Sequence, residues 1–320
     1  MSRWIRWDRK SPAAADNPIK KDHACMFKSA YIALIGRPNA GKSTLLNTVL
    51  GEELSIVSPL PQTTRKSVKG IYNREDLQLV FLDTPGVHDK GHSFNEAMVR
   101  ECRTILRADE TDIVCYLVDL SREFGAEEDE AAHLVAQSRL PALLVFNKSD
   151  SAPGAAAKVE SFIKRYPYFA ETPRVVLSAI RPESRGLFLD AVMPLVPQGM
   201  PYFPPDDLTD ASMRFFAAEY IRKHIILNTR EEVPHASFVE ITDYKETDRG
   251  HLVEATIHVE SRGQRGIIIG KGGALIRKIR ERAEKDLGSL ARAPVTIKCH
   301  LTVTPKWRDD ARFLREMGYR

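Results

Sequence analysis

Eight residues, Gly36 to Ser43, have the types and spacing of a phosphate-binding loop. They read Gly-Arg-Pro-Asn-Ala-Gly-Lys-Ser, so two glycines frame a turn that ends in a lysine and a serine. Glycines let backbone N–H groups surround a phosphate, the lysine reaches the β- and γ-phosphates, and the serine hydroxyl can bind Mg²⁺. The alternative is a chance glycine-rich turn. However, an apolar segment at 31–35 precedes the loop and a helical pattern follows it, which predicts a nucleoside triphosphate site.

A second motif, Asp83-Thr84-Pro85-Gly86, ends the apolar segment 79–82. An aspartate at the end of a strand can hold Mg²⁺ through its water shell, and the glycine can offer its N–H to the γ-phosphate. The same glycine can move when that phosphate leaves. The alternative is a turn that only ends a strand, but its place after the phosphate loop favours the metal role.

A third motif, Asn147-Lys148-Ser149-Asp150, follows the apolar segment 142–146. A carboxylate can accept hydrogen bonds from both N1–H and the 2-amino group of guanine, a pair of donors that adenine lacks. We therefore expect Asp150 to select guanine, Lys148 to pack along the base and Asn147 to tie loops together. Ser178-Ala179 would supply a backbone contact to the guanine oxygen, although that dipeptide alone is a weak signal.

Regularly spaced apolar segments must position these motifs. We expect strands at 77–82, 113–118, 142–146 and 175–177, with helices between them, for example at 95–107 and 127–138. This alternation predicts an α/β fold with a mixed, mostly parallel sheet, which binds its ligand at the carboxyl ends of the strands. Each motif above lies at such an end.

The C-terminal part of the chain has a different pattern. Residues 199–208 are rich in proline and predict a semi-rigid linker. We then expect a helix at 213–227 capped by Asp210, strands at 236–241 and 252–259, a basic helix at 275–287 and a strand at 295–303. The predicted domains are therefore a nucleotide-binding GTPase domain at 29–198, the linker at 199–208, and a second domain at 209–320, whose glycine loop is described next.

The segment before the basic helix resembles the Gly-x-x-Gly loop of an α+β KH (type II) domain, in which glycines bring the backbone against sugar-phosphate. The alternative is a glycine turn beside a solvated charged helix. From Arg262 to the end, the chain carries 15 Lys and Arg against six Asp and Glu, which favours a polyanion partner. The predicted RNA contacts are Ile267, Ile268, Ile269, Gly270, Lys271, Gly272, Gly273, Arg277 and Lys278.

Length and composition limit the remaining possibilities. A chain of 320 residues with 43% hydrophobic and 28% charged residues suggests two globular domains. No apolar run approaches the roughly 20 residues that span a bilayer. The four cysteines lie far apart, which argues against zinc or disulfides and suggests a reducing cytoplasm. Residues 1–28 are basic without an apolar core, so we expect a disordered extension and not a secretory signal.

Together the motifs resemble a translation-factor-related GTPase, and with the KH signature they resemble the Era family of bacterial ribosome-assembly GTPases over about residues 29–320. Gly263 to Arg265, Ala293 to Val295 and Trp307 add to that resemblance. The predicted nucleotide contacts are Gly36, Arg37, Pro38, Asn39, Ala40, Gly41, Lys42, Ser43, Thr44, Asp83, Thr84, Pro85, Gly86, Asn147, Lys148, Asp150, Ser178 and Ala179.

The resemblance also implies catalytic details. Thr64, favoured over Thr63, lies where such proteins carry a mobile Mg²⁺-binding threonine, so the expected Mg²⁺ ligands are Ser43, Thr64 and Asp83. The expected catalytic residues are Lys42, Thr64 and Gly86. Val87 replaces the glutamine that orients water in Ras-like proteins, which implies slow intrinsic hydrolysis. Asn39 resembles an asparagine that helps to bind K⁺ in several relatives.

For function, the family implies a GTP-hydrolysing switch that binds small-subunit ribosomal RNA near its 3′ end during subunit maturation. The expected cofactors are GTP or GDP, Mg²⁺ and possible K⁺, and we expect a cytoplasmic monomer that does not bind DNA. Peripheral contact with the inner face of the membrane is a secondary hypothesis, because basic surfaces attract anionic lipids. A P-loop kinase with an RNA-binding appendage, or a passive RNA scaffold, are the alternatives.

Overall fold

The computed structural model describes residues 27–55, 57, 68–84, 86, 100, 102–106 and 111–317. Contacts divide the chain into two compact units, and the second unit's long C-terminal stretch begins at Ala211. Of the helix expected at 95–107, only residues 100 and 102–106 are described, and they are helical. The predicted domain boundaries stay a prediction.

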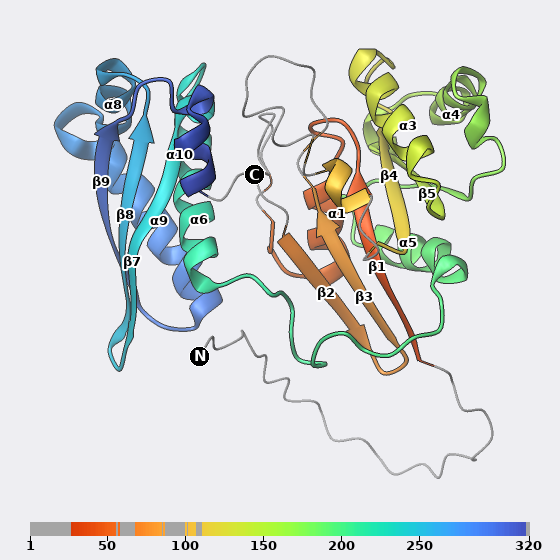
Figure 1. Cartoon of the computed structure of the whole chain (residues 1–320), viewed down its shortest axis with the longest axis horizontal. Helices are drawn as coiled ribbons and strands as arrows, with labels where there is room; N and C mark the ends of the chain where they lie inside the picture. Colours follow the sequence, from red (N-terminus) through yellow and green to blue (C-terminus); the bar gives the residue numbers. More distant parts are fainter. Residues whose placement is uncertain are drawn as a thin grey trace, which may run out of the picture. The chain divides into compact units, whose positions relative to one another are not determined.

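The first unit contains a six-stranded sheet among its described residues, in the order β2-β3-β1-β4-β5-β6 (Figure 1). All pairs are parallel except β2 with β3. This confirms the predicted α/β fold with a mixed, mostly parallel sheet. The strands are β1 (Lys28–Ile35), β2 (Val68–Arg74), β3 (Leu77–Asp83), β4 (Ile113–Asp119), β5 (Ala142–Asn147) and β6 (Arg174–Val176).

Every residue of β3 and β4 is buried, which requires cover on both faces of the sheet. Phe188 of α5 packs against Phe81 of β3, with ring centroids 5.9 Å apart. The ring of Phe162 in α4 packs against those of Tyr116 in β4 and Phe146 in β5, with centroids 5.9 and 5.3 Å apart. The helices of this unit among the described residues are α1 (Lys42–Leu50), α3 (Ala126–Ser138), α4 (Ala155–Arg165) and α5 (Ser184–Val192).

The segment predicted to be a linker packs against the first unit. Gln78 of β3 is fully buried and accepts hydrogen bonds from the backbone N–H groups of Tyr202 and Phe203, at 2.6 and 2.9 Å. The N–H of Ile71 donates to the carbonyl of Leu208 at 2.8 Å. Residues 199–208 are therefore held along β2 and β3.

The second unit has a three-stranded sheet in the order β7-β8-β9, with β7 antiparallel and β9 parallel to β8. Helices α6 and α9 pack against each other, α6 against β7 and α9 against β9 (Figure 1). The order of helix, strand, strand, helix, helix and strand that the KH resemblance implies is present, with one short helix added before the first strand. The elements are α6 (Met213–Asn228), α7 (Val233–Ala236), β7 (Phe238–Thr247), β8 (Gly250–Val259), α8 (Arg262–Ile269), α9 (Ala274–Ala291), β9 (Val295–Val303) and α10 (Ala311–Glu316).

Two details of the second unit differ from the sequence predictions. Ser212, not Asp210, caps α6, because its hydroxyl accepts from the N–H of Phe215 at 3.3 Å. Asp210 instead forms an ion pair with Lys69 at 3.2 Å. The strand expected from Ala236 begins at Phe238, because the short helix α7 occupies the preceding residues.

Candidate functional site

The phosphate loop joins β1 to α1 at the carboxyl edge of the first sheet, and close approaches explain its two glycines. A side chain at Gly36 would lie 2.5 Å from the carbonyl oxygen of Leu117 on β4. A side chain at Gly41 would lie 2.2 Å from the amide nitrogen of Asn147, and Gly41 has φ of 95°. Neither position can hold a larger residue unless its neighbours move.

Lys42 begins α1, and its ammonium group lies across the loop. It donates to the carbonyl oxygens of Gly36 and Arg37, at 3.0 and 3.3 Å. The residue is only 6% exposed. A buried cation beside the N-terminal end of a nine-residue helix forms a strongly anion-attracting site.

Ser43 and Asp83 meet beside this lysine. The Ser43 hydroxyl donates to Oδ2 of Asp83 at 2.8 Å, and Asp83 is fully buried at the end of β3. Hydroxyl and carboxylate oxygens are the donors that Mg²⁺ prefers, so the pair fits that ion. The described residues hold no group of three or more His, Cys, Asp or Glu arranged for a metal.

Asn147 connects the loops on the base side. Its amide nitrogen donates to the carbonyl of Ala40 at 2.8 Å, and its amide oxygen accepts from the N–H of Ala179 at 2.8 Å. One side chain thus links the phosphate loop, the end of β5 and the Ser178-Ala179 segment, which is the role expected for it.

Asp150 is held as an ionised acceptor. The hydroxyl of Ser178 donates to its Oδ1, and that of Ser151 donates to its Oδ2 at 2.7 Å. The hydrogen bond from Ser178, followed by that from Ser151, lowers the pKa of the carboxyl below its usual value. A carboxylate that is ionised at neutral pH can accept both guanine donors.

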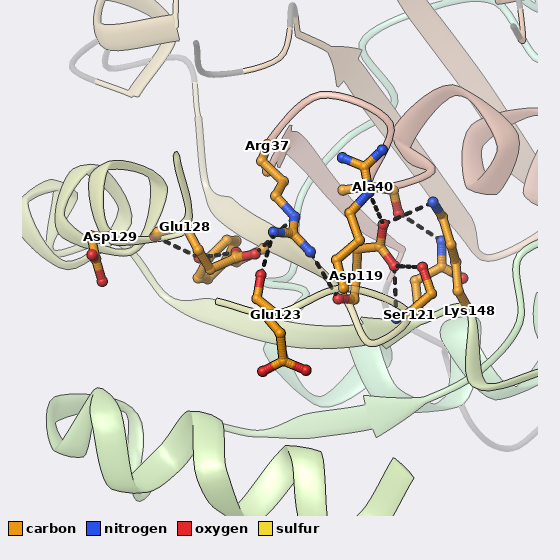
Figure 2. Close-up of polar contacts among 12 residues, drawn as sticks. Arg37, Ala40, Asp119, Ser121, Glu123, Glu128, Asp129 and Lys148 are labelled. Carbon is orange, nitrogen blue, oxygen red and sulfur yellow. Dashed lines mark hydrogen bonds and ion pairs between the residues drawn. The ribbon is translucent and has the colours of Figure 1, made fainter. Parts of the chain in front are cut away.

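Asp119 is a site residue that the sequence analysis missed. It is fully buried at the end of β4 and accepts from Nζ of Lys148 at 2.8 Å and from the N–H of Ser121 at 2.9 Å (Figure 2). Burial alone would raise its pKa, but the hydrogen bonds from Lys148 and Ser121 lower it. Lys148 has φ of 62°, an unusual value for a lysine, and Asp119 fixes the direction of its side chain. An acid directly after an apolar strand was the available signal.

Several residues named in the sequence analysis lie outside the described part of the chain, namely Thr63, Thr64, Pro85 and Val87. Gly86 is described and buried, and Thr84 donates to the carbonyl of Leu34 at 2.6 Å, which ties the end of β3 to β1. Asn39 has φ of 61° in the phosphate loop. Their roles toward Mg²⁺, K⁺ and phosphate stay predictions.

In the second unit, the glycine loop joins α8 to α9. Ser261 and Gln264 form a capping box at the start of α8, and Gly272 and Gly273 have φ of 58° and 77°. The three basic side chains predicted to meet RNA are exposed around this loop: Lys271, Arg277 and Lys278.

The three isoleucines before the glycine loop do not share one environment. Ile267 is 52% exposed, whereas Ile268 is fully buried in the core of the unit. The prediction that all three line an RNA groove is therefore corrected for Ile268. On a helix, successive residues face directions about 100° apart, so three in a row cannot all line one groove.

Comparison with known protein families finds two matches in this chain, one in its N-terminal half and one in its C-terminal part. The family model described as a 50S ribosome-binding GTPase matches residues 31–148, and the KH domain model matches residues 232–308. No helix among the described residues is long and apolar enough to cross a membrane.

Proteins named GTPase Era are similar over almost the whole chain. The one from Geobacter metallireducens is 40% identical over 309 residues, which cover 95% of this chain and 99% of the relative. The one from Clostridium novyi is 37% identical, covering 92% of this chain and 100% of the relative.

Two solved Era structures are also similar. A crystal structure of an Aquifex aeolicus Era variant bound to GDP and AlF₄⁻ matches with a TM-score of 0.86 at 31% identity, over 92% of this chain and 99% of the other. Era in complex with MgGDPNP and nucleotides 1506–1542 of 16S ribosomal RNA matches with a TM-score of 0.85 at the same identity and coverage. On this evidence, the chain belongs to the Era family and is a GTPase with a C-terminal KH domain.

Proposed function

We propose that the chain is a GTP-dependent switch that binds small-subunit ribosomal RNA near its 3′ end and acts in maturation of that subunit. One observation supports this most directly: residues suited to phosphate, Mg²⁺ and guanine converge at one sheet edge in a chain that also carries an exposed basic KH loop. The Era structure that holds both MgGDPNP and 16S ribosomal RNA adds support by family membership.

In this proposal, Lys42 binds the β- and γ-phosphates, and Ser43, Asp83 and Thr64 would hold Mg²⁺. When bound, the ion would supply positive charge to the phosphate oxygens. The N–H of Gly86 binds the γ-phosphate, and Asn39 contributes to a K⁺ site. The other residues predicted above as nucleotide contacts complete the site.

The γ-phosphate is what distinguishes the GTP-bound from the GDP-bound state of the chain. We propose that Thr64 and Gly86 bind on the γ-phosphate side, so that GTP would favour one arrangement of their loops and GDP would release it. Such a ligand changes RNA affinity only to the extent that it binds one arrangement better than the other. We propose that the GTP state favours RNA binding in the cytoplasm, with peripheral membrane contact as a secondary role.

Ultraviolet crosslinking of the full chain to cellular RNA, with GTP or GDP supplied, tests the switch. We expect crosslinks to concentrate at the 3′ end of small-subunit ribosomal RNA and to be stronger with GTP. Scattered crosslinks would contradict the proposed RNA target, and equal crosslinking with both nucleotides would contradict a switch and favour a passive scaffold.

A negative charge in the KH loop should weaken RNA binding without removing GTP hydrolysis. At Gly272, φ is 58° and an added Cβ would meet nothing within 4 Å. After glycine, Asn and Asp are among the residues that adopt this conformation most readily, so Gly272→Asp should fold. Repulsion of sugar-phosphate and loss of close backbone approach should lower RNA affinity at least about tenfold.

Gly272→Asn is the matched control, because it has the same shape without the charge. We expect its RNA affinity to lie between those of the wild type and Gly272→Asp, while both variants retain GTP turnover. RNA affinity retained in Gly272→Asp, measured by fluorescence anisotropy with an RNA oligonucleotide, would contradict the proposed RNA loop.

A further inference from the structure

The guanidinium group of Arg37 lies inside the protein although the residue belongs to the phosphate loop. Its side chain is 5% exposed, and Figure 2 shows it directed toward Glu123 and Glu128. Nη1 donates to the carbonyl oxygen of Glu123 at 2.9 Å, and Nη2 donates to that of Asp119 at 3.1 Å. Arg37 is among the predicted nucleotide contacts, but both of its terminal guanidinium nitrogens donate to backbone carbonyls within the protein, so the structure corrects that prediction for its side chain.

The third partner of Arg37 is the carboxylate of Glu128, which is fully buried on the first turn of α3. Nε of Arg37 lies 3.1 Å from Oε2, a distance that makes an ion pair although the two groups are not aligned for a hydrogen bond. The hydroxyl of Tyr116 donates to Oε1 at 2.5 Å. We call the contacts of Arg37 with Asp119, Glu123 and Glu128 the Arg37 bridge.

The Arg37 bridge ends on the segment that positions the guanine loop. Asp119 offers its carbonyl to Arg37 and its carboxylate to Lys148, and Leu120 donates its N–H to the carbonyl of Asn147 at 3.0 Å. The same short segment, 119–123, thus contacts the phosphate loop on one side and the residues before Asp150 on the other.

We propose that Arg37 and Glu128 are positioning residues that hold the phosphate and guanine subsites in register, so that guanine selectivity depends on an arginine that touches no base. This inference rests on the nucleotide site proposed above. Its physical basis is preorganisation: groups that contact a ligand bind it best when a second layer of contacts fixes them beforehand.

A purely structural role would also make Arg37 sensitive to substitution. Removing one partner of a buried ion pair leaves an uncompensated charge and destabilises the fold, whereas removing both charges costs much less. Arg37→Gln alone would therefore confuse stability with positioning. The double variant Arg37→Gln/Glu128→Gln removes both charges and should recover much of the thermal stability, yet it still lacks the guanidinium donors to Asp119 and Glu123.

The experiment measures affinity for GDP and for IDP, which lacks the 2-amino group, by competition against a fluorescent GDP analogue with the full chain. In the double variant, GDP affinity should fall roughly 10- to 100-fold, as when outer groups that orient metal ligands are removed. IDP affinity should fall less, so the preference for GDP over IDP should shrink. Glu128→Gln alone leaves the Arg37 charge uncompensated and should lower the thermal stability. It keeps the guanidinium bonds to both carbonyls, so its preference for GDP over IDP should shrink less than that of the double variant.

Arg165→Gln is the matched control. Arg165 also forms an ion pair with a carboxylate of α3, Asp129, at 2.8 Å, but that pair is about half exposed and Asp129 lies apart from Arg37 (Figure 2). We expect wild-type GDP affinity and GDP preference in this variant.

The outcomes separate the two proposals. Global destabilisation lowers the affinities for GDP and IDP equally, so it leaves the preference for GDP unchanged. An unchanged preference in the double variant would therefore overturn the Arg37 bridge alone. GDP affinity that recovered together with thermal stability would do the same. A wild-type chain that bound GDP no better than IDP would overturn both the bridge and the proposed guanine site. A reduced preference in the double variant, with Arg165→Gln at wild-type values, would support the bridge.

Discussion

Replacing Lys42 with alanine is expected to remove measurable GTP binding at micromolar concentrations. The Lys42 ammonium is the buried cation described at the start of α1, with its Nζ already within 3.0 Å of one loop carbonyl. Two hydrogen bonds from a charged donor to phosphate contribute about 1.5–3 kcal/mol each, so affinity should fall about 10²- to 10⁴-fold. Isothermal titration calorimetry with GTP and Mg²⁺ measures this loss.

The control is Lys164→Ala, which removes an exposed lysine from α4 of the same unit. It should bind GTP with wild-type affinity. Thermal unfolding without nucleotide should be recorded for both variants, because Lys42 also donates to Gly36 and Arg37 within the loop. A folded Lys42→Ala protein with wild-type GTP affinity would contradict the assignment of the phosphate site.

The motifs and most strands were predictable because each parallel strand forms an apolar run that a polar motif ends. The predicted strands at 77–82, 113–118 and 142–146 each begin at the observed residue and extend one residue further in the structure. In contrast, β2 was missed, since this edge strand is only partly buried and mixes polar with apolar residues. An antiparallel edge strand of this kind has no continuous apolar run.

Long-range contacts of single polar residues were not predictable. The carbonyl groups that Arg37 contacts lie 82 and 86 positions along the chain, and no spacing rule connects them to the phosphate loop. Asp119 likewise accepts the hydrogen bond from Lys148 only because β4 and β5 are neighbours in the sheet. Sequence patterns identified which groups could bind a nucleotide, whereas the fold decided which groups hold them in place.

Local geometry also decided between adjacent candidates. Both Asp210 and Ser212 are residue types that commonly cap helices, and Ser212 directly precedes the helix expected from residue 213, which the choice of Asp210 overlooked. The start of α6 at Met213 places the serine, and not the aspartate, within reach of the N–H of Phe215. In the same way, the helical rotation of α8 separates buried Ile268 from exposed Ile267.

Replacing Asp150 with asparagine is expected to change the preferred base from guanine to xanthine. A carboxylate presents two acceptors, which match the N1–H and 2-amino donors of guanine. An asparagine amide presents one acceptor and one donor, which match the N1–H and the 2-carbonyl of xanthine. Because the amide faces the 2-amino group donor to donor, GDP affinity should fall about 10²- to 10⁴-fold.

Competition of GDP and XDP against a fluorescent nucleotide measures this change, with Asp190→Asn as a control that alters an exposed aspartate of α5. The low pKa of Asp150, set first by the Ser178 hydrogen bond, keeps the wild-type carboxylate ionised at neutral pH, so its two acceptors are present there. Wild-type preference for GDP in Asp150→Asn would mean that another group reads the base. A preference for XDP in Asp150→Asn, but not in Asp190→Asn, would assign base selection to the Asp150 carboxylate. The Arg37 bridge could then affect base selection only by positioning the loop that carries Asp150.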